Sequence, residues 1–237
     1  MNAVLRSDEA GVTTLTLNRP DKRNAIDGAM FDELRSHAEA LMAAGDAIGC
    51  VVLTGQGPAF SAGADTEMMA APTATETWIR RAETVDMLGQ LPQPVIAAVR
   101  GHCYAGGLEL ALTADLILVS ETAKMRDIHA RYGGHPAWGL TARLPRRIGT
   151  AQAKRMLLLQ HVVTGEEAMR IGLAEQCLPD DELDAAATAM ARAIADGSRV
   201  AAFRLKHLAG RSLQVSLDEQ IAYERNYRGR VRKAGGW

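Results

Sequence analysis

Hydrophobic and polar positions follow two different periods along the first part of the chain. Residues 12–18, VTTLTLN, alternate β-branched residues and leucines at a period of two and precede the turn sequence RPDKRN, which predicts a strand ending in a turn. Between Asp27 and Gly45 the apolar residues instead recur at helical spacing, which predicts a helix that Asp27 caps.

Short apolar runs bounded by turn residues predict three more strands, at residues 50–54, 94–99 and 116–120. The first two lead into glycine-bearing loops, GQGPAFSAGAD and GHCYAGG, and a helical pattern lies at residues 75–91. The repeated order of strand, glycine loop and helix is typical of an α/β fold, in which strand ends and helix N-termini meet at one site.

Strand patterns nearly vanish after about residue 141, and helical patterns replace them. The segment DDELDAAATAMARAIAD has one apolar stripe, and SLDEQIAYERNYRGR begins with a capping residue. We therefore expect a core of residues 1–178 and a C-terminal helical region of residues 179–237, which is either a second small domain or an oligomerisation layer.

Composition and charge narrow the class of protein. A chain of 237 residues with 47% hydrophobic and 23% charged residues and a net charge of −1 is an ordinary globular protein without the basic excess of a nucleic-acid binder. The N-terminus lacks the pattern of a signal peptide, and Glu109 and Asp115 interrupt the longest apolar run, so we expect a cytoplasmic protein with no membrane span.

Candidate metal and nucleotide sites fail on spacing. The three cysteines form no C-x-x-C pair, and His129 and His135 belong to no H-E-x-x-H motif, so no metal site is predicted. Neither glycine loop has the spacing of a dinucleotide fingerprint or a P-loop. The loops could be tight turns, or they could aim two backbone N–H groups at one carbonyl oxygen as an oxyanion hole.

Glu109 is the most informative ionisable residue because it stands in an otherwise apolar run after GHCYAGG. An unpaired carboxylate in a protein core is costly. Glu109 is therefore either paired structurally or equipped by a raised pKa to act as an acid or base.

Four segments resemble, in this order and spacing, the crotonase family, also called the enoyl-CoA hydratase/isomerase family. They are LTLNRPDKRNAID, GQGPAFSAGADTEM, PVIAAVRGHCYAGGLELALTADL and GLTARLPRRIGTAQAKRMLL, and the similarity runs from residue 4 to residue 224. The resemblance implies a spiral of ββα units that binds an acyl-CoA thioester, with C-terminal helices packing subunits into homotrimers or hexamers. It implies no cofactor beyond the CoA of the substrate.

The resemblance also assigns site residues. The two N–H groups that hold the thioester oxygen fall on Ala64 and Gly106. Basic residues near the CoA phosphates fall on Lys22 and Arg23, although these two could equally belong to a solvated turn. The rest of the CoA path falls on the segment AGADTE, with Ala62, Ala64, Asp65, Thr66 and Glu67.

The resemblance places Glu109 at one of the two glutamates that handle the water and the α-proton in hydratases, and His129 at the other. Imidazole can accept or donate one proton, so His129 could assist Glu109, but it could also be an idle loop residue bonded to Asp127 or Glu109. We expect an enoyl-CoA hydratase with Glu109 as the principal acid/base and His129 as an auxiliary, with weak or altered hydratase activity. The alternatives are an isomerase that uses Glu109 alone and a protein that binds acyl-CoA without turnover.

The C-terminus carries a basic segment, YRGRVRKAGGW, which is shorter than the closing helix usual in the family. Its cations, Arg228, Arg230, Arg232 and Lys233, could reach CoA phosphates or form a solvated tail.

Overall fold

The computed structural model describes residues 2–233, with side chains up to residue 227. Its main element is a six-stranded sheet with the order β1-β2-β3-β4-β6-β9. β1 pairs antiparallel with β2, and the other neighbouring strands of this sheet are parallel. The strands are β1 (Val4–Glu9), β2 (Val12–Leu17), β3 (Cys50–Gly55), β4 (Val95–Val99), β6 (Leu116–Ser120) and β9 (Gln176–Leu178).

Burial explains which of these strands the sequence pattern predicted. Every residue of β4 is buried, because helices cover the sheet on both sides, so its sequence is a continuous apolar run. β1 lies at the edge of the sheet, and Val4 is its one buried residue. Its polar sequence therefore contains no strand pattern, and β1 was not predicted.

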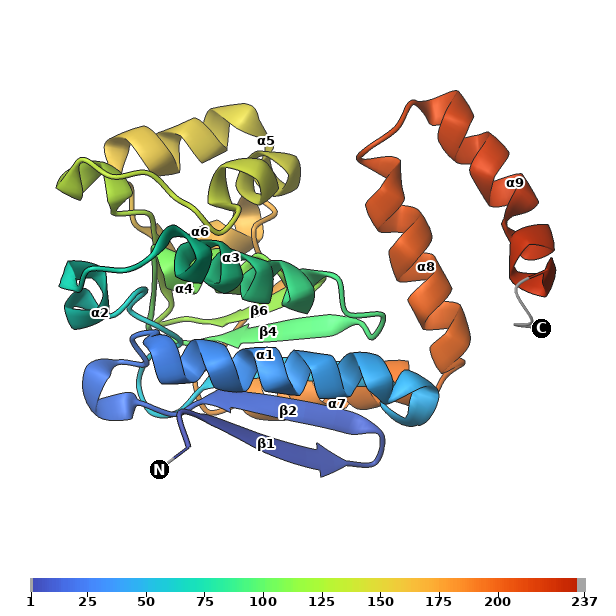
Figure 1. Cartoon of the computed structure of the whole chain (residues 1–237), viewed down its shortest axis with the longest axis horizontal. Helices are drawn as coiled ribbons and strands as arrows, with labels where there is room; N and C mark the ends of the chain where they lie inside the picture. Colours follow the sequence, from blue (N-terminus) through green and yellow to red (C-terminus); the bar gives the residue numbers. More distant parts are fainter. Residues whose placement is uncertain (1, 234–237) are drawn as a thin grey trace.

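Alternate residues of the strands face two different helical layers (Figure 1). On one side, Val51 and Leu53 of β3 pack in the same cluster as α1 (Gly28–Ala43) and α3 (Thr75–Gly89). On the other side, the intervening Val52 packs in a cluster with α7 (Leu183–Ala195). The predicted cap of α1 is confirmed, because Asp27 accepts a hydrogen bond from the backbone N–H of Met30 at 2.9 Å.

A second, smaller sheet has the order β5-β7-β8 and positions the two polypeptide segments that matter for the site. It consists of β5 (His102–Tyr104), β7 (Lys124–Arg126) and β8 (Val163–Thr164). β5 leads directly into α4 (Gly106–Ala111), and β7 leads into the segment that contains His129. The sequence pattern missed these strands because each has only two or three residues.

The strands expected at residues 12–18, 50–54, 94–99 and 116–120 and the helices at 27–45 and 75–91 are confirmed. The expectation that strands nearly vanish after residue 141 needs correction, because β8 and β9 lie in that region. They have only two and three residues, which is too short for an apolar run to be recognised. The other helices near the core are α2 (Thr66–Ala70), α5 (Leu140–Leu159) and α6 (Gly165–Arg170).

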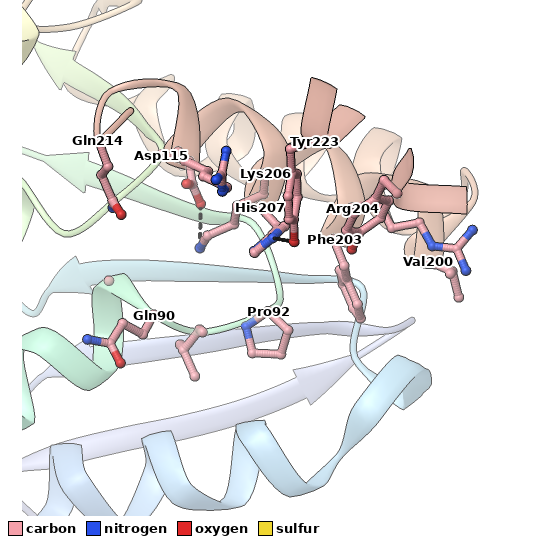
Figure 2. Close-up of a pocket in the computed structure, with 15 residues that line it drawn as sticks. Gln90, Pro92, Asp115, Val200, Phe203, Arg204, Lys206, His207, Gln214 and Tyr223 are labelled. Carbon is pink, nitrogen blue, oxygen red and sulfur yellow. Dashed lines mark hydrogen bonds and ion pairs between the residues drawn. The ribbon is translucent and has the colours of Figure 1, made fainter. Parts of the chain in front are cut away.

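Two helices, α8 (Arg199–Ser212) and α9 (Leu217–Lys233), form a pair beside one end of the main sheet (Figure 1). A cavity of about 760 Å³ lies between this pair and the body of the molecule (Figure 2). Lys206 of α8 reaches Asp115 with Nζ and Oδ2 2.8 Å apart, and the ring of His207 is hydrogen-bonded to the Tyr223 hydroxyl at 3.1 Å. In residues 2–233, we find no helix whose length and hydropathy suit a membrane crossing.

Candidate active site

Glu109 lies in α4, a helix in which all six residues are buried. Its side chain is held by the main chain at the start of α5. Oε1 accepts hydrogen bonds from the backbone N–H groups of Trp138 at 2.7 Å and Leu140 at 3.2 Å. These hydrogen bonds orient the buried carboxylate so that its second oxygen, Oε2, lies on the side away from the two main-chain donors.

Burial raises the pKa of Glu109 above its ordinary value, although the two backbone hydrogen bonds and the charge of His129 act in the opposite direction. The carboxylate is therefore paired structurally through Oε1, and the direction of its pKa shift is the one expected of a buried acid or base.

His129 faces the second oxygen of Glu109, with Nε2 and Oε2 3.9 Å apart. The other ring nitrogen, Nδ1, lies 2.5 Å from Oδ1 of Asp127, a carboxylate only 2% exposed. Burial lowers the pKa of His129, but the hydrogen bond and charge of Asp127 and the charge of Glu109 outweigh it and leave that pKa above its ordinary value. Three ionisable side chains from two segments therefore form one row.

The two glycine loops meet beside this row. A Cβ atom on Gly63, whose φ is +100°, would lie 3.3 Å from the backbone nitrogen of Gly106. Ala105 precedes α4 with φ 46° and ψ −115°, a conformation that L residues rarely adopt. Gly106 is the first residue of α4, where an N–H group has no carbonyl partner within the helix and is directed out of the helix end.

The N–H group of Ala64 is also directed away from its neighbouring segment. Ile26 donates its N–H to the Gly63 carbonyl at 2.8 Å and accepts from the Asp65 N–H at 2.9 Å. In such a parallel bridge, the residue between the two bonded groups turns its own N–H to the opposite side. The structure therefore brings Ala64 and Gly106 into adjacent loops, each with an N–H group outside the main-chain ladder.

The segment AGADTE continues from Ala64 into α2. The Asp65 carboxylate caps that helix by accepting from the Glu67 N–H at 2.9 Å, and it pairs with Arg19 at 2.9 Å. Burial alone would raise the pKa of Asp65, but the hydrogen bonds from Arg19, Met68 and Glu67 hold it below its ordinary value. Ala62 is partly buried and Thr66 is exposed, and the Asp65 carboxylate is engaged by Arg19 and the start of α2.

Lys22 and Arg23 are neighbours in sequence but face different surroundings. Lys22 lies 3.6 Å from the Glu67 carboxylate, and both side chains are exposed. Arg23 lines a cavity of about 370 Å³ together with His102 and Lys124. Burial and the charges of Arg23 and Lys124 lower the pKa of His102, so two cations line this cavity beside a histidine. The basic side chains Arg228, Arg230, Arg232 and Lys233 lie outside the residues whose side chains are described.

The family model for enoyl-CoA hydratase/isomerase matches residues 7–233. The chain belongs to this enoyl-CoA hydratase/isomerase family. Among its relatives, the probable enoyl-CoA hydratase of Mycobacterium bovis is 35% identical over 223 residues, which are 94% of this chain and 86% of that protein.

Solved structures agree with the fold. Pseudomonas aeruginosa DspI is similar with a TM-score of 0.92 and 32% identity, covering 99% of this chain and 97% of that chain. A putative enoyl-CoA hydratase from Thermobifida fusca YX in complex with acetoacetyl-CoA has a TM-score of 0.89 and 29% identity, covering 98% of this chain and 96% of that chain. The α/β crotonase fold with C-terminal helices, expected from the sequence motifs, is confirmed.

Sequence reasoning missed several residues that position the site of this enoyl-CoA hydratase/isomerase family member. Trp138 and Leu140 hold Glu109 through backbone N–H groups, and backbone donors leave no sign in side-chain chemistry. Gly139 between them has φ +101°, and this Trp-Gly turn ahead of a helical pattern was the available signal. Arg19, which ties the first loop to Asp27 and Asp65, could have been suspected from its place just before a turn.

Proposed function

We propose that the chain is an enoyl-CoA hydratase, which adds water across the double bond of a 2-enoyl-CoA thioester. The observation that carries this proposal is the facing pair of Glu109 Oε2 and His129 Nε2, 3.9 Å apart, beside the N–H groups of Gly106 and Ala64. A buried acid/base pair next to two main-chain donors is the equipment that addition of water to a thioester-activated double bond requires.

In this proposal, the thioester oxygen accepts hydrogen bonds from the N–H groups of Ala64 and Gly106. Attack of water at C3 places negative charge on that oxygen as the enolate forms, and the two donors stabilise it. Removing one donor of this kind costs roughly 2.7–4 kcal/mol of transition-state stabilisation.

The proton transfers are assigned to Glu109 as the principal acid/base and His129 as the auxiliary. Oε1 of Glu109 is occupied by two N–H groups, so Oε2 is the oxygen that meets the substrate water. An imidazole, neutral or charged, cannot accept two hydrogen bonds from a water molecule as a carboxylate can, which supports weak or altered hydratase activity. These steps need no cofactor beyond the CoA of the substrate.

Binding of CoA is assigned to the main chain of residues 62–67 and to Lys22 and Arg23. Support comes from the cavity that Arg23 and Lys124 line together with His102. A phosphate group in this cavity would interact favourably with the two cations, Arg23 and Lys124. The acetoacetyl-CoA complex of the Thermobifida fusca relative supports the thioester class. We further propose a cytoplasmic homotrimer or hexamer.

Isomerisation of a 3-enoyl-CoA is the second candidate, because the buried Glu109 carboxylate has one oxygen, Oε2, directed away from its main-chain donors and toward His129. A single such base can move a proton between two carbons of an enolate.

The test is to incubate the purified protein with 2-enoyl-CoA and with 3-enoyl-CoA thioesters of several chain lengths, and to follow the products by mass spectrometry and chromatography. A product heavier by one water supports the hydratase, and a shifted double bond at unchanged mass supports the isomerase. Tight binding without either product would contradict the proposed activity and indicate an acyl-CoA-binding protein.

A further inference from the structure

Asp127 is a buried carboxylate that depends on one partner. It is 2% exposed, and its Oδ1 lies 2.5 Å from Nδ1 and 3.3 Å from the backbone nitrogen of His129. Among the described residues, His129 is the one side chain that pairs with it. A buried carboxylate without a cation is strongly unfavourable, so this geometry favours a positively charged imidazole.

We propose that Asp127 is a positioning residue that keeps His129 charged, with its Nε2–H turned to the Glu109 side, so that His129 gives the proton that C2 of the bound thioester receives. This inference rests on the proposed hydratase function. It assigns one proton transfer to each group: Glu109 accepts a proton, and His129 donates one.

The orientation of the ring follows from the contact of Asp127 with Nδ1. Because Nδ1 donates to Asp127, Nε2 is the nitrogen that faces Oε2 of Glu109. Their separation of 3.9 Å is too long for a direct hydrogen bond, so the Nε2–H is available to a substrate atom between the two groups.

The other charged groups around His129 do not replace Asp127. Arg126 of β7 donates to the Gln160 carbonyl, and Arg143 of α5 donates to the Trp138 carbonyl and to Asp86. Arg131 and His135, from the same loop as His129, are exposed. The charges that act on His129 are therefore those of Asp127 and Glu109, and both raise its pKa.

Glu109 and His129 together account for every proton that moves in the step. Water forms the C3–O bond and gives one proton to Glu109 Oε2, while the π electrons of the C2–C3 double bond move into the thioester enolate. The enolate then takes the Nε2 proton of His129 at C2, which leaves neutral imidazole and protonated Glu109. Transfer of the proton from Oε2 to Nε2 restores both groups after the product leaves.

The experiment measures the pKa of His129 by NMR titration of the histidine-¹⁵N-labelled protein, assigned by the signal that His129→Gln removes. In the unchanged protein we expect a pKa above the ordinary imidazole value and a proton retained on Nδ1. In Asp127→Asn that pKa falls by roughly 1–3 pH units. Asp180→Asn, an exposed carboxylate bonded to Thr122, is the matched control and leaves the His129 titration unchanged.

Turnover provides the second measurement. In Asp127→Asn the alkaline limb of kcat/KM moves to lower pH with the His129 pKa, and activity above both pKa values falls about tenfold for each pH unit of that shift. Asp127→Glu retains the negative charge and returns the alkaline limb part of the way to its original pH. A purely structural role of Asp127 would not produce this return.

The inference is overturned if His129 of the unchanged protein titrates at or below its ordinary pKa, a result that needs no variant to fold. It is also overturned if Asp127→Asn lowers the rate without moving the alkaline limb. Failure of the proposed function is distinguishable, because a protein that hydrates no enoyl-CoA still reports the His129 pKa by NMR.

Discussion

The indole ring of Trp138 lies against the main chain of Gly106, where a Cβ atom would be 2.2 Å from Cζ3 of the ring. The same tryptophan donates its backbone N–H to Glu109 at 2.7 Å. Trp138 itself is only 4% exposed and packs edge-on against Phe31. One buried residue therefore contacts both the proposed oxyanion donor and the proposed base, which lie in the same helix.

Gly106→Ala should reduce both activity and stability, because the new methyl group would displace the Trp138 ring and with it the Glu109 carboxylate. Overpacking of this kind costs about 1–3 kcal/mol of unfolding free energy. Denaturant unfolding and turnover of 2-enoyl-CoA measure the two effects. Gly210→Ala is the control, since a Cβ there meets nothing within 4 Å, and this helical substitution should stabilise by about 0.5–1 kcal/mol. Unchanged activity in Gly106→Ala would contradict the proposed site.

Glu109→Gln should lower kcat by roughly 10²–10⁴-fold while leaving CoA affinity nearly unchanged. The amide oxygen can still accept from the Trp138 and Leu140 N–H groups, so the site keeps its shape but loses its base. Steady-state kinetics and calorimetric titration with CoA separate the two quantities. Glu39→Gln, at an exposed carboxylate on α1, should change neither. Full activity in Glu109→Gln would remove this residue from the mechanism.

The pH profile of kcat/KM should be bell-shaped, with both limbs displaced upward. Glu109 must be deprotonated to act as a base, and its raised pKa moves the acid limb above the ordinary carboxyl range. His129 must be protonated to act as an acid, and its raised pKa moves the alkaline limb above the ordinary imidazole range. The two limbs report the coupled pair and not isolated residues. A profile without an alkaline limb would contradict a role for His129 as the acid.

Arg19→Ala should destabilise the fold through the first loop. Arg19 donates to the Ala25 carbonyl at 2.6 Å and pairs with Asp65 at 2.9 Å and Asp27 at 3.2 Å, so its loss should cost about 1–3 kcal/mol. Because the folded pKa of Asp65 is lowered, its contribution is present above the ordinary carboxyl pKa and is lost as pH falls through the folded value.

Urea unfolding at neutral and acid pH should show this directly. The difference between the unchanged protein and Arg19→Ala is expected to shrink in acid. Arg192→Ala, which removes an exposed pair with Glu9, should change stability by no more than about 1 kcal/mol. An equal effect of the two substitutions at neutral pH would argue against the role assigned to Arg19.

The helical pair α8 and α9 should mediate assembly into a homotrimer or hexamer. Leu205, Leu213 and Leu217 are 67%, 60% and 74% exposed, and exposed apolar side chains of this size are candidates for a subunit interface. Light scattering after size exclusion measures the mass. Leu205→Asp should shift it toward the monomer, whereas Leu5→Asp, on the edge strand β1, should not. A monomeric mass for the unchanged protein would contradict the expected assembly.

The sequence by itself determined β2, β3, β4 and β6 of the main sheet and the first long helix, and it singled out Glu109. The central strands are buried on both faces, so their apolar runs are visible without neighbours, and α1 has one face in the core and a capping aspartate. Glu109 was conspicuous because a carboxylate in a buried helix must have a physical reason. Motif order then indicated the family, which the comparisons confirm.

The tertiary structure decided what surrounds these residues. It separated Lys22 from Arg23, formed the short strands of the second sheet and brought Asp127, His129 and Glu109 into one row. Periodicity reports burial along one element, whereas the Trp138 N–H reaches Glu109 across 29 residues of chain. Such contacts depend on how separate elements pack, and that packing also fixes which nitrogen of His129 faces Glu109, a choice that sequence patterns do not encode.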